Sequence, residues 1–223
     1  MSESAERLIC ARAQDGARVG IDLVGDDDAL LESFWPPTGL ERQARTSQAL
    51  ALRLSADLQS IDSLTRLESD LGLFAAEHLV DEVAVHAAII KADDQVIVLP
   101  GESMTGKSTL CAAAHTAGHA VLSDEYVLID PESGWVRGWP RSLRLRVDGQ
   151  WVRRGVARPH EPVAVTLIAA IAYDDHAGPD AGLLDLEPMT PGEVAMLLLA
   201  NTVCAQARPE DSLRAASALA RQA

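Results

Sequence analysis

Apolar residues follow two spacings along the chain, and together these predict an alternation of strands and helices. The segments 83–90 (VAVHAAII) and 96–100 (VIVLP) are almost continuously apolar, which predicts two strands, the second one buried. Residues 107–117 are expected to form a helix, and residues 120–130 (AVLSDEYVLID) another strand. Strands and helices that alternate in this way predict an α/β fold.

Other elements are expected on both sides of this region. They are a hairpin over 8–24 that turns at Asp15-Gly16, a helix over 63–80, two arginine-bearing strands at 135–147 and 150–157, a buried strand at 163–173, a helix opened by a capping box at 190–193, and a C-terminal helix over 210–223. No internal repeat and no Gly/Ser linker interrupts the sequence. We therefore expect one domain, 1–223, with an N-terminal hairpin and helix portion (1–80) and a core (81–223).

Composition indicates a soluble protein. The 223 residues are 48% hydrophobic and 23% charged, and no apolar run approaches the roughly 18 residues of a membrane span. The first sixteen residues carry acids and lack the apolar stretch of a signal peptide. Cys10, Cys111 and Cys204 lie far apart without a CxxC pair, which argues against a disulfide framework. We expect a cytoplasmic protein with no membrane partner.

Charge is unevenly distributed. The net charge of −14 disfavours binding to nucleic acid. Between Arg137 and Arg158, however, lie seven arginines and a single acid, Asp148. One interpretation is a charged edge strand that resists aggregation. The other is a surface that meets phosphates, which the guanidinium fork binds in a bidentate manner.

The sequence Gly101-Glu102-Ser103-Met104-Thr105-Gly106-Lys107-Ser108 matches the phosphate-loop pattern GxxxxGK[ST]. Its glycines let the backbone curl so that N–H groups point at phosphate oxygens, and the helix that follows adds its positive end. Lys107 would reach the β- and γ-phosphates of ATP, and the Ser108 hydroxyl would bind Mg²⁺. With Thr109, these residues form the expected nucleotide site. A glycine turn without a ligand is the alternative.

Acids and a histidine lie near this loop in the sequence. Asp124-Glu125 interrupts the expected strand 120–130, and we expect Asp124 to hold the metal and its neighbour to accept a proton from the attacking group. Two solvated acids in a surface turn would be the alternative. His86, in the strand before the loop strand, is interpreted either as a core histidine or as a site residue. The other histidines form no HxH or HExxH metal pattern.

The ordered set of His86, the loop 101–108, Gly118-His119 and Asp124-Glu125 resembles the catalytic core of HPr kinase/phosphorylase and its kinase relatives. The resemblance implies a compact phosphate-loop domain with a mixed sheet, shared with phosphoenolpyruvate carboxykinase. It also implies ATP-dependent phosphorylation of a hydroxyl, usually that of a serine. Lys107 would contact the phosphates, the acidic pair would supply the base, and His86 would lie beside it. Arg141, after Trp139-Pro140, is the arginine we expect closest to the site.

Departures from the family pattern limit this resemblance. The family has a glycine at the position of Met104, an acid at that of Thr109, and Asp-Asp where this chain has Asp124-Glu125. A second downstream signature is missing, and residues 1–80 do not resemble the family's usual N-terminal domain. We therefore expect a kinase relative in which reverse phosphorolysis is doubtful.

Three functions follow from these patterns. The first is an ATP-dependent kinase acting on a serine-like hydroxyl of a peptide, protein or small molecule. The second is an ATPase or switch in which Glu125 directs water. The third is a nucleotide-binding accessory protein without useful turnover. The sequence leaves open the identity of the acceptor and whether copies of the chain associate.

Overall fold

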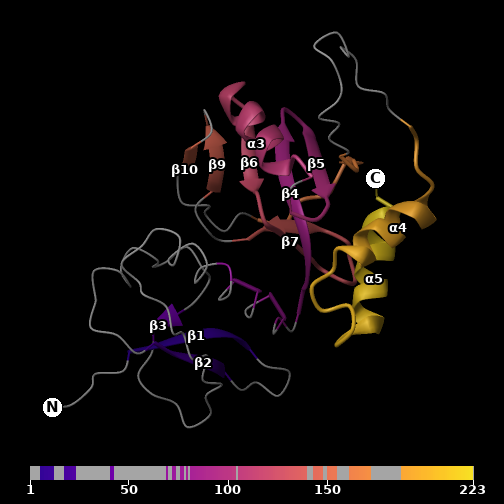
Figure 1. The fold of residues 1–223 in the computed structure, drawn as a ribbon. Helices are drawn as coiled ribbons and strands as arrows, with labels where there is room; N and C mark the ends of the chain where they lie inside the picture. The colour runs from indigo at the N-terminus through magenta and orange to yellow at the C-terminus, as the bar shows by residue number, and fades with distance from the viewer. Residues whose placement is uncertain are drawn as a thin grey trace, which may run out of the picture.

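The structure is a computed structural model (Figure 1). It describes residues 6–12, 18–23, 41–42, 69, 72–73, 76–77, 79, 81–103, 105–139, 143–147, 150–154, 161–171 and 187–222. Within 6–42 and 143–154, the description covers the backbone only. Met104, Pro140 and Arg141 lie outside the described residues, as does most of the helix predicted at 63–80.

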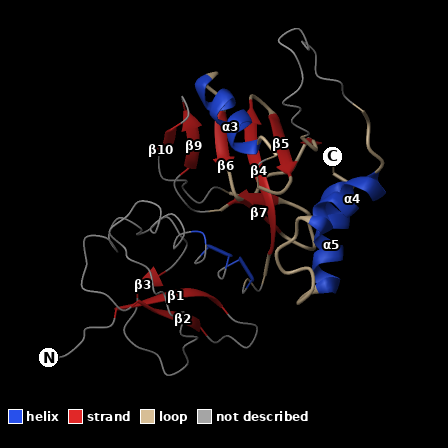
Figure 2. Ribbon diagram, viewed as in Figure 1, coloured by secondary structure: helices blue, strands red, loops and turns tan. Residues whose placement is uncertain are grey.

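The described core is a mixed sheet of six strands with three helices (Figure 2). The strands are β4 (Val83–Ala92), β5 (Gln95–Pro100), β6 (Ala120–Ser123), β7 (Tyr126–Ile129), β8 (Val136–Gly138) and β11 (Leu167–Ile168). Their order is β11-β5-β4-β7-β8, and β6 also pairs with β4. Because β5 runs antiparallel to β4 and parallel to β11, the sheet is mixed, as predicted.

Helices pack on both faces of this sheet. They are α3 (Lys107–Thr116), α4 (Pro191–Ala200) and α5 (Pro209–Ala220). Successive side chains of a strand point to opposite faces, and the burial of β4 follows this rule. Val83, Val85 and Ile89 join the apolar cluster that includes residues of α4 and α5, whereas Ala88 and Ile90 pack with Cys111 of α3. The segment 83–90 is continuously apolar because its side chains are buried in two apolar clusters, one on each face of the sheet.

The N-terminal hairpin forms where the sequence predicts it. Strands β1 (Glu6–Arg12) and β2 (Arg18–Leu23) pair antiparallel, and β3 (Glu41–Arg42) pairs with β1. A second hairpin joins β9 (Leu143–Val147) to β10 (Gln150–Arg154), and β9 lies next to α3. The strand predicted at 135–147 is therefore wrong in extent, because it contains β8 of the six-stranded sheet as well as β9, whereas β9 and β10 form a two-stranded sheet of their own.

Two further strand predictions are wrong in extent. Residues 120–130 form two strands, because Asp124-Glu125 separates β6 from β7. In 163–171, the described part of the strand predicted at 163–173, Leu167–Ile168 is a strand and Val163 makes an isolated bridge to Val136. Thr166 is the reason for the second difference: its hydroxyl accepts a hydrogen bond from the Val96 N–H (2.9 Å) and donates one to the Val96 carbonyl (3.1 Å). This side chain occupies main-chain positions that a longer ladder would use.

The two C-terminal helices begin close to their predicted positions. Thr190 caps α4 in a complete capping box, in which the Glu193 N–H donates to the Thr190 hydroxyl and the Glu193 carboxylate accepts from the Thr190 N–H. The predicted helix 210–223 is α5, and its buried face consists mostly of alanines. In the described part of the chain, no helix has the length and apolar character needed to cross a membrane.

Candidate functional site

The glycine loop, residues 101–108, connects β5 to α3 and closes tightly on itself. Gly106 has a φ of 97°, a left-handed conformation that favours glycine. The Thr105 hydroxyl donates to the Glu102 carbonyl at 3.0 Å. A Cβ on Gly101 would lie 3.0 Å from that hydroxyl oxygen. The two glycines thus meet different needs: one supplies an unusual dihedral angle, and the other supplies space.

Lys107 is folded back against the start of the glycine loop. Its side chain is buried, and Nζ donates to the carbonyls of Gly101 and Glu102, both at 2.5 Å. Burial lowers the pKa of Lys107, while the Cys111 thiol and the carboxylates of Glu125 and Glu102 act to raise it. The ammonium is therefore held where the loop begins, within electrostatic reach of Glu102 of the loop and of Glu125 between β6 and β7.

The first turn of α3 is an uncapped positive end. Its N-cap residue is Gly106, which has no side chain to accept a hydrogen bond, and the first turn contains no acidic residue. The Leu110 N–H donates to the Gly106 carbonyl at 3.0 Å. The N–H groups that precede Leu110, in the first turn of α3, therefore point toward the loop as donors. This arrangement suits an anion.

The acidic pair lies two strands away from the loop strand, with β4 between them. His86 pairs with Tyr126, and Ile89 pairs with Ser123, so the register is unbroken across Asp124 and Glu125. The Ala87 N–H donates to the Glu125 carbonyl at 3.0 Å, which holds the backbone of the pair against β4. The acids interrupt the secondary structure without leaving the sheet.

Electrostatic interactions connect the acidic pair with α3. Asp124 is only 7% exposed, and its charge helps to raise the pKa of the fully buried Cys111 thiol to about 12. Burial is the larger cause of that shift, and Lys107 opposes it. The charge of Glu125 acts to raise the pKa of Lys107. Both predicted acids therefore lie close enough to the predicted lysine and its helix to influence their charge, which argues against two solvated acids in a surface turn.

His86 lies at the junction of the loop, the acidic strand and the C-terminal helices. Its carbonyl accepts from the Gly101 N–H (3.2 Å), and its own N–H donates to the Asn201 carbonyl (2.8 Å). The centroid of its ring lies 5.8 Å from that of Tyr126. The side chain is half-buried and lines a cavity. This position differs from that of a histidine enclosed in the apolar core.

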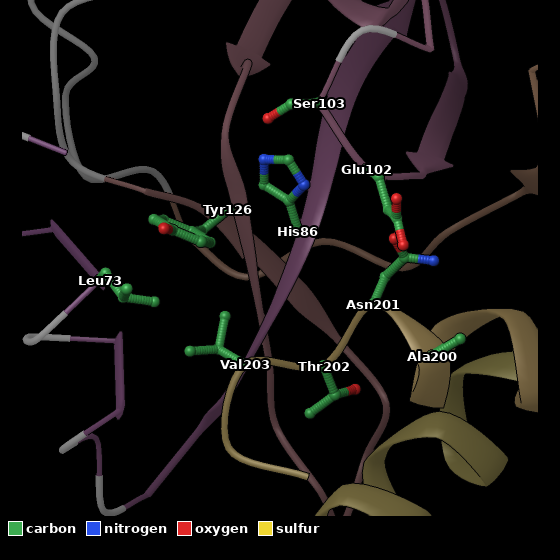
Figure 3. A pocket seen from close by; sticks show the side chains of 9 residues that line it. All are labelled: Leu73, His86, Glu102, Ser103, Tyr126, Ala200, Asn201, Thr202 and Val203. Carbon is green, nitrogen blue, oxygen red and sulfur yellow. The ribbon is translucent and has the colours of Figure 1, made fainter. Parts of the chain in front are cut away.

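The cavity has a volume of about 500 Å³ and opens beside the glycine loop (Figure 3). Its described lining residues come from five parts of the chain and are Leu73, His86, Glu102, Ser103, Tyr126, Ala200, Asn201, Thr202 and Val203. The segment 200–203, which follows α4, was not among the sequence-predicted site residues. It carries no motif, and only its backbone bonds to β4 bring it to the loop, including the bond from the Val203 N–H to the Ala84 carbonyl (2.9 Å).

The arginine-rich segment, 137–158, is described at 137–139, 143–147 and 150–154. Arg137 forms a bidentate ion pair with Glu82, whose carboxylate raises the arginine's pKa. That arginine is therefore engaged by an acid of its own chain. In the hairpin, Arg144 pairs with Arg153 along the backbone. Arg141, the arginine predicted nearest the site, lies outside the described residues.

Comparison with models of protein families, with curated proteins and with solved structures found no match to this chain.

Proposed function

We propose that the protein is an ATP-dependent kinase that transfers the γ-phosphate to a serine-like hydroxyl. The observation that carries the proposal is the position of Lys107, held by the carbonyls of the glycine loop and within the electrostatic reach of Glu125. The loop has the GxxxxGK[ST] pattern between a strand and a helix, the context in which such loops bind phosphates. A phosphate-loop nucleotide domain, with a fold like that of HPr kinase, is part of the same proposal.

The described side chains suit the charge changes of phosphoryl transfer. Lys107 can move from the loop carbonyls to phosphate oxygens, which are stronger acceptors because they are charged. The uncapped N–H groups of α3 would hold the remaining phosphate oxygens. These contacts position the triphosphate and offset its charge, and most catalysis of phosphoryl transfer arises from such effects.

The chemical step can be written with the groups at the site. The acceptor oxygen forms a bond to the γ-phosphorus while the bond from that phosphorus to the β–γ bridging oxygen breaks. The electron pair of the broken bond leaves with ADP. The hydroxyl proton passes to the Glu125 carboxylate, and the electrostatic interaction of Glu125 with Lys107 supports this role.

Mg²⁺ fits the oxygen groups on offer. A hydroxyl at Ser108, in the first turn of α3, and a buried carboxylate at Asp124 are hard ligands of the kind magnesium prefers. Within the described residues there is no cluster of three or more His, Cys, Asp or Glu side chains able to hold a metal. Magnesium bound with a nucleotide usually needs only one or two carboxylates besides phosphate and water. When bound, it would neutralise charge on the β- and γ-phosphates.

The two lysines of the chain provide a matched test of nucleotide binding. Lys107→Met should weaken Mg-ATP binding at least tenfold, because it removes a buried ammonium from the phosphate site. Lys91→Met changes an exposed lysine at the far end of β4 and should leave binding unchanged. Calorimetric titration with Mg-ATP measures both. Equal affinity in the wild type and Lys107→Met would remove the loop from the account.

ATP hydrolysis is the second candidate function. The feature that favours it is Asp124-Glu125, because many ATPases have an aspartate followed by a glutamate at this position. A hydrolase would release phosphate at a rate that no acceptor changes. Binding without any turnover would instead assign the chain to the accessory class. ATP labelled in its γ-phosphate distinguishes the three outcomes: label on an acceptor, label released as phosphate, or no loss of label from ATP.

A further inference from the structure

The cavity of about 500 Å³ opens at the end of the glycine loop where a γ-phosphate would lie. Lysines of such loops reach the β- and γ-phosphates. Lys107 Nζ lies against the carbonyls of Gly101 and Glu102, so the γ-phosphate end corresponds to the beginning of the loop. Glu102 and Ser103, the next residues, line the cavity. A group bound there would lie beside the phosphorus atom to be transferred.

Asn201 provides this cavity with an unused hydrogen-bond acceptor. Its Nδ2 donates to the Leu197 carbonyl of α4 at 2.9 Å, which fixes the orientation of the amide. Its Oδ1 is buried, and among the described residues no donor reaches it. A buried acceptor without a donor is costly, so a ligand that donates a hydrogen bond there would be favoured.

Glu102 adds a negative charge to the lining of the same cavity. Figure 3 shows the side chains of Glu102 and Asn201 around the cavity, together with those of Tyr126 and Leu73. A carboxylate and an amide oxygen are both acceptors, so they cannot bond to one another. A group with several N–H donors, such as an ammonium, can satisfy both.

We propose that this cavity is the acceptor subsite and that it selects a hydroxyl compound carrying a nearby cationic or neutral hydrogen-bond donor. This inference rests on the proposed kinase function, because it assigns the cavity to the phosphoryl acceptor. Asn201 Oδ1 accepts from the donor, and Glu102 favours a positive charge on it. An acceptor with a carboxylate at this position is disfavoured, since no lysine or arginine is among the described lining residues and the acid Glu125 directly precedes the lining residue Tyr126 in the chain.

Three two-carbon alcohols of similar size test this selectivity directly. At neutral pH ethanolamine carries an ammonium, ethylene glycol is neutral, and glycolate carries a carboxylate. Saturation-transfer NMR on the full chain without nucleotide should rank binding in that order. Glycolate binding as well as or better than ethanolamine would overturn the proposal, as would equal binding of all three.

Two substitutions of Asn201 separate its oxygen from its role at the end of α4. Asn201→Leu removes the acceptor and should weaken ethanolamine binding at least about tenfold, the loss expected for a hydrogen bond to a charged group. Asn201→Asp also loses the bond to the Leu197 carbonyl but keeps an oxygen, so ethanolamine binding should persist. If Asn201→Leu does not fold, Glu102→Gln, in the exposed loop, should reduce the preference for ethanolamine over ethylene glycol. Unchanged preference in Glu102→Gln would also refute the inference.

Calorimetry with Mg-ATP on the same samples distinguishes the two proposals. ATP binding with phosphate transfer, but no discrimination among the three alcohols, would refute the subsite and leave the kinase assignment intact. Discrimination among the alcohols without any ATP binding would refute the kinase assignment, and the acceptor role of the cavity with it.

Discussion

Replacing Gly101 by alanine should deform the glycine loop, and the damage should largely disappear once Thr105 is shortened. An alanine Cβ would lie 3.0 Å from the Thr105 hydroxyl oxygen and 3.5 Å from its Cβ and Cγ2. Overpacking of this kind costs about 1–3 kcal/mol, and a partly exposed loop with one close contact suggests about 1 kcal/mol. Thr105→Ala removes the bond to the Glu102 carbonyl, which is worth about 0.5–1 kcal/mol.

The double variant distinguishes a local clash from a general effect. If Thr105 is the obstacle, Gly101→Ala/Thr105→Ala should cost about 1 kcal/mol, not the sum of about 2, giving a coupling of about 1 kcal/mol. Urea unfolding at 25 °C measures these differences, and Mg-ATP titration should show a loss of about fivefold in Gly101→Ala that the double variant recovers. Gly192→Ala, which has no atom closer than 4.0 Å to the new Cβ, is the control. Strict additivity would refute this account of the loop.

Three further predictions concern the acids, the buried thiol and a second glycine. Glu125→Gln and Asp124→Asn should each lower turnover about 10²–10⁴-fold with Glu125→Gln still binding ATP, and full activity in both would end the kinase mechanism drawn above. Burial raises the pKa of Cys111 to about 12, so the unfolded chain loses the thiol proton at a lower pH than the folded protein does. The free energy of unfolding therefore falls as pH rises from the ordinary thiol pKa toward 12. Urea unfolding between pH 9 and 10.5 should show a steeper loss, by up to about 1.4 kcal/mol per pH unit, in the wild type than in Cys111→Ala; parallel curves would contradict this. Gly134→Ala should destabilise far more than Gly118→Ala by thermal unfolding, since both have positive φ but only Gly134 would place a Cβ 2.8 Å from the α5 backbone, and equal losses would show that α5 yields.

Local patterns predicted the elements around the glycine loop because each carries its own signal. The apolar runs of β4 and β5 reflect burial on both faces, and the capping box at Thr190 and Glu193 marks the start of α4. The strand predicted at 163–173 is mostly irregular for a reason that composition does not show. Thr166 bonds to the Val96 backbone through its side chain, which depends on the tertiary neighbour.

The candidate site divides in the same way. Lys107, Asp124 and Glu125 could be predicted because a loop motif and an acidic pair in a strand are visible in the sequence, and the structure brings them together. Asn201 could not be predicted, since it follows α4 without any motif, and long-range backbone bonds between 201–203 and β4 hold it beside the cavity. Such long-range contacts between non-repeating segments leave no local periodicity.

Following the γ-phosphate of labelled ATP is the most direct measurement of the proposed phosphoryl transfer. The wild-type chain, with Mg²⁺ and a panel of serine peptides with basic, neutral or acidic flanks, should place label on the serine hydroxyl of the basic and neutral peptides. The transfer should be lost in Lys107→Met and retained in Lys91→Met. Label released only as inorganic phosphate, at a rate that no peptide changes, or no release at all, would contradict the account.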